Sequence, residues 1–222
     1  MNLYFVVSTS QRELSKGVNL MVPLWVVLIA ILVGCASVPD DHRIDNFPMY
    51  GQPAIQRPNF LKKADEDFIT EASSGLGSRE AASKAWAAKA DEYMNKRDYH
   101  YAMRRYNQSW LLNPNNYQPH WGFGRIMLER GKLGESLSRF EKAKELLDDQ
   151  YQKVALLADT GSAYSVKANQ LPKDKAQERA DSFRLANENF QQSISLDPSY
   201  TKCYFVWARS LYWEERYADA WE

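Results

Sequence analysis

Histidine, cysteine and net charge are scarce in this sequence, and each scarcity excludes a class of protein. The 222 residues carry 28 basic and 28 acidic side chains, so a formal net charge of zero argues against non-specific attraction to nucleic acid or to an anionic bilayer. The three histidines, His42, His100 and His120, are scattered and lack the spacing of a zinc site. With only two cysteines, Cys35 and Cys203, the chain has no disulfide framework.

A long apolar run is also missing. The most apolar stretch, Leu20–Val33, has 14 residues; it falls short of the ~20 needed to cross a bilayer as a helix and fits the hydrophobic region of an export signal. Reading the chain from its first methionine, rather than from Met21, places Arg12 and Lys16 ahead of this stretch as the positive region that such a signal requires. Residues 1–34 are therefore predicted to be a signal peptide.

The end of this stretch, Leu32-Val33-Gly34-Cys35, resembles the lipobox of bacterial lipoproteins. The resemblance implies a mature chain that begins at a lipid-modified Cys35 and is anchored by several acyl chains. Ala36 stands where an aspartate retains family members at the inner membrane, so the resemblance implies the periplasmic side of the outer membrane, with the inner membrane less favoured. The alternative is an uncleaved N-terminal anchor in which the cysteine is incidental. In a lipoprotein, Cys203 would be the one remaining thiol, and we expect it to be buried and inert.

Residues 35–59 are predicted to form a tether. The segment has no helix or strand period and is interrupted by four prolines, Pro39, Pro48, Pro53 and Pro58. At ~3.1 Å per residue, such a chain would reach roughly 75 Å and hold a folded domain clear of a lipid surface. Alternatively, the aromatic residues Phe47, Tyr50 and Phe60 dock part of the tether onto the domain, and the sequence leaves both options open.

From residue 60 onward the apolar residues fall at helical spacing, and no strand signal follows. A leading amphipathic helix and the turn that ends it, near Gly75-Leu76-Gly77, are expected within residues 60–82.

Side chains of matching size then recur about every 34 positions. One unit reads Trp86-x2-Lys89-Ala90-x2-Tyr93, Ala102-x3-Tyr106 and Pro114, and 34 residues later Gly124, Met127 and Phe140 replace Ala90, Tyr93 and Tyr106. A third unit reads Leu157-x2-Thr160-Gly161-x2-Tyr164, Ala186-x3-Phe190 and Pro198, and a fourth opens with Tyr204-x2-Trp207-Ala208-x2-Leu211. The pattern resembles that of the tetratricopeptide repeat (TPR), W-x2-L-G-x2-Y followed by A-x3-F and P.

This resemblance implies an all-α fold. The implied fold is a TPR α-solenoid, a right-handed superhelix of helix-turn-helix hairpins, with about three full repeats and a partial fourth. The array would cover residues 83–222, divided at about 83–116, 117–150, 154–200 and 201–222. Thirteen extra residues in the third unit, around Asn169–Asp174, predict a longer loop and a second helix with extra N-terminal turns. Because the fourth unit lacks most of its second helix, either the chain is cut short relative to its relatives or a partner or second copy completes the stack.

In proteins that the array resembles, the first helices of successive hairpins line a groove that receives a peptide or a helix of another protein. The positions carried over to this chain are Lys84, Asp91 and Met94 in the first unit, Trp121, Arg125 and Leu128 in the second, and Phe205, Arg209 and Tyr212 in the fourth. Such mixtures of aromatic and arginine side chains are typical of protein interfaces. The lysine and asparagine pattern of the carboxylate-clamp members is absent, so a bound chain terminus is not implied.

No catalytic constellation stands out in the sequence. The stretch Gly75-Leu76-Gly77-Ser78 lacks the following GK[ST] and the preceding strand of a phosphate loop. We therefore predict no enzyme activity and no cofactor, metal or nucleic-acid site. The expected function is that of a membrane-tethered scaffold for protein–protein interaction in the bacterial cell envelope, serving the assembly of a pilus, secretion or outer-membrane complex. Two alternatives stay open: an enzyme or accessory acting on peptidoglycan, and a structural spacer without exposed groove aromatics.

Overall fold

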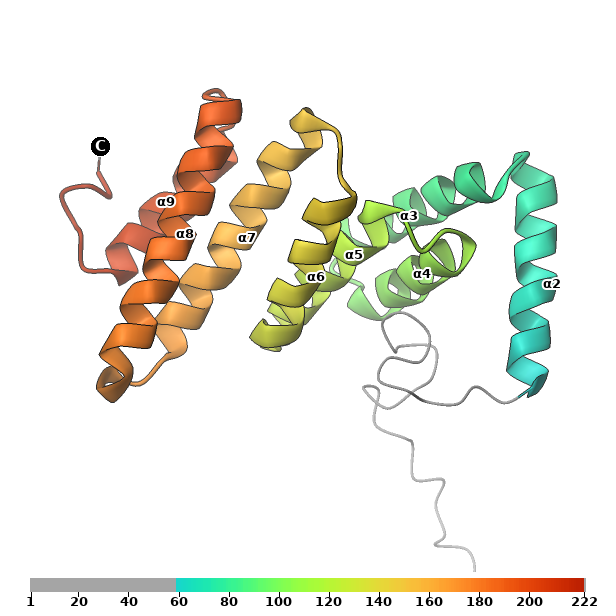
Figure 1. Ribbon diagram of the computed structural model, residues 1–222, viewed down its shortest axis with the longest axis horizontal. Helices are drawn as coiled ribbons and strands as arrows, with labels where there is room; N and C mark the ends of the chain where they lie inside the picture. The colour runs from blue at the N-terminus through green and yellow to red at the C-terminus, as the bar shows by residue number, and fades with distance from the viewer. Residues whose placement is uncertain (1–58, 222) are drawn as a thin grey trace, which may run out of the picture. The chain divides into compact units, whose positions relative to one another are not determined.

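The computed structural model describes residues 59–221 of the chain (Figure 1). The predicted signal peptide, Cys35 and the tether up to residue 58 lie outside the described residues. Within residues 59–221 there are eight α-helices, one short 3-10 helix and no strand. The helices are α2 (Asn59–Leu76), α3 (Arg79–Asn95), α4 (Tyr99–Leu112), α5 (Tyr117–Glu129), α6 (Leu133–Leu146), α7 (Gln150–Gln170), η3 (Lys173–Lys175), α8 (Ala176–Leu196) and α9 (Thr201–Trp213). The predicted all-helical fold is confirmed for this part of the chain, and none of its helices has the length and apolarity needed to cross a membrane.

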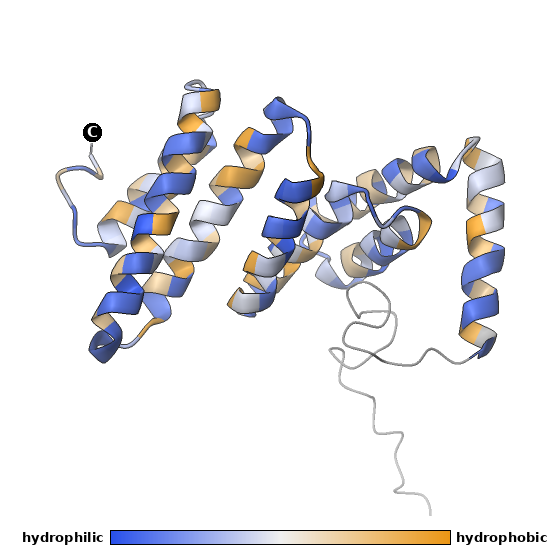
Figure 2. Ribbon diagram, in the orientation of Figure 1, coloured by the Kyte–Doolittle hydropathy of each residue, from blue (hydrophilic) through white to orange (hydrophobic). Residues whose placement is uncertain are grey.

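Consecutive helices pack against one another throughout this region. The most extensive contacts join α3 to α4, α5 to α6 and α7 to α8, and each of these hairpins then contacts the next through α4 and α5, α6 and α7, and α8 and α9. Apolar and polar residues mix along each helix (Figure 2), as expected for helices that bury one stripe and expose another. This consecutive packing is compatible with an α-solenoid.

One face of the stack is formed by the first helix of each hairpin. Helix α3 contacts α5, α5 contacts α7, and α7 contacts α9, whereas the second helices α4, α6 and α8 make no contact with one another in the described region. The first helices are therefore closer together than the second helices. We call the surface shared by α3, α5, α7 and α9 the inner face.

Short polar residues mark where several helices begin. The side chains of Ser78, Asp98, Asn116 and Asp149 accept hydrogen bonds from backbone N–H groups in the first turns of α3, α4, α5 and α7. Each bond satisfies a donor that the helix itself leaves unpaired, which stabilises a helix start by about 1 kcal/mol. These caps fix the ends of the hairpin helices.

Glycines allow the two helices of a hairpin to approach closely. A β-carbon at Gly124 of α5 would lie 2.4 Å from the ring of Phe140 on α6, and one at Gly161 of α7 would lie 2.6 Å from the ring of Phe190 on α8. Both phenylalanine rings are fully buried. In two successive hairpins, a recurring small residue therefore packs directly against a recurring large one.

The same tight turn follows three of the helices. Arg97, Gly131 and Glu215 have positive φ values of 58°, 71° and 65°, and in each turn the next residue's N–H donates a 2.9 Å hydrogen bond back into the preceding helix. The turn joins α3 to α4 and α5 to α6. Its third copy follows α9.

The third hairpin differs from the sequence-based expectation. The thirteen extra residues were expected in a longer loop and at the start of the second helix, but Asn169 and Gln170 still belong to α7. We compare the third hairpin with the second by aligning Gly161 with Gly124 and Phe190 with Phe140. Relative to α5, helix α7 is then four residues longer at its C-terminal end, and relative to α6, helix α8 is seven residues longer at its N-terminal end. The connection between the two helices is only two residues longer. Helical extension satisfies the backbone hydrogen bonds of the insert, which an exposed loop would leave to water.

Candidate functional site

A row of alternating charges crosses the inner face from α3 to α9. Arg125 of α5 lies 3.7 Å from a carboxylate oxygen of Asp91 on α3 and 3.9 Å from one of Asp159 on α7. Lys202 of α9 lies 3.0 Å from the other oxygen of Asp159. We call these four residues the ion-pair row. It links the first helices of four successive structural units, and its formal charges cancel.

Two aromatic residues hold the carboxylates of the row in place. The Tyr106 hydroxyl donates a 2.6 Å hydrogen bond to Asp91, and the Trp121 indole N–H donates a 2.9 Å hydrogen bond to Asp159. By contrast, Arg125 approaches both carboxylates only at ion-pair distance. Because a guanidinium has five N–H donors in a planar fork, Arg125 keeps donors that can bind a ligand.

A polar hollow of about 270 Å³ opens beside Trp121 and Arg125. Amide, hydroxyl and carboxylate groups from three first helices surround it, and its lining consists of Asp91, Asn95, Tyr117, Gln118, Trp121, Gly122, Arg125 and Gln152. Its size suits a side chain of a partner protein. The hydrogen-bonding groups favour a polar or charged side chain, and the rings of Tyr117 and Trp121, 6.5 Å apart, offer an aromatic wall.

Burial and a neighbouring charge shift the pKa values of two groups of the row, Asp91 and Lys202. Burial raises the pKa of the Asp91 carboxyl, while the hydrogen bond from Tyr106 and the charge of Arg125 oppose that rise. The Asp159 carboxylate raises the pKa of the Lys202 ammonium. A raised lysine pKa stabilises the folded state below the ordinary lysine pKa, and this contribution is lost as the pH rises through the raised value.

The structure brings three of the nine predicted groove residues together. Asp91, Trp121 and Arg125 line the same polar hollow. Lys84 lies elsewhere on α3, exposed and paired with Glu80 at 2.7 Å.

Two predicted groove residues contribute to the core. Met94 is only 6% exposed and packs among apolar residues of the first hairpin and α5, so its assignment to an exposed groove was wrong. Leu128 is partly buried against the second core cluster. Both are apolar residues near the end of a first helix, and each packs in a cluster formed with the second helix of its hairpin and the first helix of the next one.

The remaining predicted residues form a separate patch on α9. Phe205 and Tyr212 are 72% and 61% exposed, and the Arg209 guanidinium lies 5.0 Å from the centre of the Trp213 ring. Positions 205, 209 and 212 recur at helical spacing and therefore share one side of α9.

Sequence reasoning missed Asp159, although a signal for it was present. Asp91, Arg125 and Asp159 follow one another at intervals of 34 residues. The third unit was instead aligned on Gly161, which is displaced from that spacing by three residues. The simple 34-residue period would have placed Asp159 beside Arg125.

The described residues contain no group of three or more histidine, cysteine, aspartate or glutamate side chains placed to hold a metal ion. Cys203 is buried, and its burial raises the pKa of the thiol. Comparison with models of known protein families and with curated protein sequences gives no match to this chain.

Proposed function

We propose that the chain is a TPR protein of the bacterial lipoprotein type that binds a segment of another protein on its inner face. Cys35 would carry the lipid anchor, and the protein would act as a scaffold in the assembly of an envelope complex, on the periplasmic side of the outer membrane. The stacked hairpins and the 34-residue pattern of side-chain size support the assignment to the TPR family.

The observation that carries the binding proposal is the polar hollow at Trp121 and Arg125. It lies where first helices of successive hairpins meet, and it combines an aromatic wall with an arginine that has unused donors. Tryptophan, tyrosine and arginine side chains are enriched among the few residues that contribute most of the binding free energy in protein interfaces. A partner side chain with acceptor groups would complete the hydrogen bonding of Arg125.

A photo-crosslinking amino acid at Gln152 tests the proposal, because this residue lines the hollow. Full-length protein is crosslinked in intact cells, and the captured proteins are identified by mass spectrometry. We expect a discrete partner that is lost in the variant Trp121→Ala/Arg125→Ala. The matched control is Tyr101→Ala/Arg104→Ala, which removes a stacked tyrosine and arginine from α4, a second helix.

The crosslinking outcomes separate scaffold from spacer. Loss of the partner in the inner-face variant alone, with both variants folded by circular dichroism, supports the proposal. Equal capture by both variants, or no partner at all, contradicts binding at this hollow and favours the structural spacer.

Labelling with a clickable palmitate tests the lipid anchor separately. We expect the wild type to be labelled and Cys35→Ala to be unlabelled, and persistent labelling of the variant would exclude Cys35 as the lipid site.

A further inference from the structure

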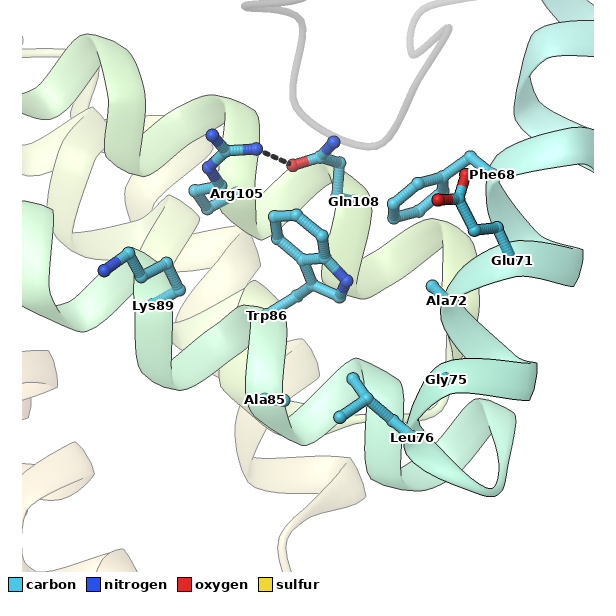
Figure 3. A pocket seen from close by; sticks show the side chains of 10 residues that line it. All are labelled: Phe68, Glu71, Ala72, Gly75, Leu76, Ala85, Trp86, Lys89, Arg105 and Gln108. Atoms are coloured by element: carbon cyan, nitrogen blue, oxygen red, sulfur yellow. Dashed lines mark hydrogen bonds between the residues drawn. The ribbon is translucent and has the colours of Figure 1, made fainter.

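A second, more apolar hollow lies near the N-terminal end of the described region, between α2, α3 and α4. Figure 3 shows Phe68 of α2 and Trp86 of α3 on facing sides of it, with Arg105 and Gln108 of α4 along its edge. The centres of the Phe68 and Trp86 rings lie 5.4 Å apart, and the two rings contact each other edge to face. The hollow has a volume of about 710 Å³. We call it the α2 groove.

One wall of the α2 groove is an apolar stripe on α2. Phe68, Ala72 and Leu76 follow one another at intervals of four residues and all line the groove, so they lie on the same side of the helix. Leu76 remains 48% exposed. Helix α2 therefore presents an apolar surface that α3 and α4 cover only in part.

The opposite edge of the groove is aromatic and cationic. The Arg105 guanidinium lies 4.8 Å from the centre of the Trp86 ring and donates a 2.7 Å hydrogen bond to Gln108. Its Nε group is buried and finds no hydrogen-bond partner among the described residues. Lys89 also belongs to the lining, where it pairs with Glu92 at 2.6 Å. An aromatic floor flanked by such donors is the arrangement with which proteins bind proline-rich segments in the polyproline II conformation.

The segment that directly precedes α2 has this chemistry. Residues 44–58 read Ile-Asp-Asn-Phe-Pro-Met-Tyr-Gly-Gln-Pro-Ala-Ile-Gln-Arg-Pro. The stretch contains three prolines, and its aromatic residues Phe47 and Tyr50 each lie within three positions of a proline. Asp45 supplies a carboxylate two residues before Phe47, which complements the positive charge of the Arg105 guanidinium at the edge of the groove.

Chain length allows this segment to reach the groove. Phe68 and Leu76 lie nine and seventeen residues beyond Asn59, the first residue of α2, which is ~14 and ~26 Å along the helix axis. Tyr50 lies nine residues before Asn59, and nine residues of polyproline II span ~28 Å. A chain that turns back at the start of α2 can therefore place Phe47 and Tyr50 in the groove. Because the connection is covalent and short, the effective concentration of the segment there is in the millimolar range.

We propose that the proline-rich segment 44–58 of the same chain docks in the α2 groove, with Phe47 or Tyr50 against Trp86 and Asp45 beside Arg105. Docking completes the packing of α2 on α3 and α4. It depends neither on lipidation of Cys35 nor on a partner at the inner face. Of the two options that the sequence left open for the tether, docking is the one that the groove favours.

A benzophenone amino acid at Glu71 of the full-length protein tests the proposal, because Glu71 lines the groove and is exposed. Thr70 is the matched control because it is also exposed. It is rotated by about 200° around the axis of α2 from Phe68, so a probe there faces away from the groove. Purified protein is irradiated and digested, and the crosslinked peptides are identified by mass spectrometry. We expect the Glu71 probe to crosslink to residues 44–58, and the Thr70 probe not to.

Two further measurements identify the occupant. A mixture of isotope-labelled and unlabelled protein should give crosslinks only within single chains. The variant Phe47→Ser/Tyr50→Ser, whose changes lie outside the described helices, should lower the crosslinking yield at least about tenfold, as expected for loss of a buried aromatic anchor. The control Tyr151→Ser removes an exposed tyrosine on α7 and should leave the yield unchanged. Crosslinks between chains would show that a second copy fills the groove and would overturn the proposal. Equal yields from the Glu71 and Thr70 probes, or no effect of the double substitution, would overturn it as well.

Discussion

The buried histidine of α5 makes the stability of this fold depend on pH. His120 is only 4% exposed, and its Nε2 lies 3.1 Å from the carbonyl oxygen of Pro114, to which it donates in the neutral form. Its Nδ1 is buried and has no hydrogen-bond partner in the described region. Burial, together with the positive charges of Arg139 and Lys142, lowers the pKa of His120 to about 4 from the ordinary value of 6.5.

The sign of the effect follows from this lowered pKa. Below pH 6.5 the unfolded chain takes up a proton at His120 while the folded chain does not, so acidification favours unfolding. The loss of stability begins near pH 6.5 and is complete near pH 4. A pKa difference of this size corresponds to about 3 kcal/mol in total, of which about 2 kcal/mol is lost by pH 5.

Urea unfolding followed by circular dichroism at pH 7 and pH 5 measures this loss. Between the two pH values, wild-type protein should lose about 2 kcal/mol more than His120→Gln, since glutamine keeps a donor for Pro114 but does not titrate. The control Asn115→Gln, a change at an exposed residue that does not titrate, should lose as much stability as the wild type. Equal losses in the wild type and His120→Gln would refute the assignment of a buried, neutral His120.

Three further substitutions test how the hairpins are built, each by urea unfolding. Gly124→Ala should destabilise the fold by about 1–3 kcal/mol through the clash with Phe140, and adding Phe140→Leu should recover part of this loss. If Gly124→Ala left the stability unchanged, the close approach of α5 and α6 would be contradicted. Arg97→Gly should stabilise the fold by up to about 1 kcal/mol, because glycine adopts positive φ without strain, and Gly131→Arg should destabilise it. Ser78→Ala should cost about 1 kcal/mol through loss of the cap on α3, whereas Ser78→Asp should not.

The order and pairing of the helices could be predicted because they depend on side-chain size. Gly124 and Phe140 lie sixteen positions apart in the sequence, yet a β-carbon on the glycine would meet the ring at 2.4 Å. Only a close helix hairpin satisfies such a pair. The recurrence of small and large residues therefore carries the three-dimensional information directly.

Charged groups of the candidate site were harder to predict than the core. Asp91 and Arg125 each lie one residue after the small core residue of their helix, Ala90 or Gly124, whereas Asp159 lies two residues before Gly161. Because this three-residue difference is close to one helical turn, the Asp159 carboxylate stays on the same side of its helix, and an alignment on core residues does not show it. The prediction that Met94 lines the groove was wrong for a related reason. Periodicity places Met94 on α3, but whether its side chain is buried depends on the packing of α4 and α5. The TPR assignment, the signal peptide and the lipid anchor stay predictions.

The lengthened third hairpin shows how such a stack accommodates change. Helices α7 and α8 each have 21 residues, against 13 and 14 for α5 and α6, so the connection at Leu171–Lys175 stands about 6–10 Å further out than its counterpart. Among the described residues each hairpin contacts only its sequence neighbours, so growth at this tip leaves the more distant hairpins in place. The same tip is thus suited to insertion of an epitope or a fluorescent reporter, and the dimensions of one unit can change while the inner face of the others stays intact.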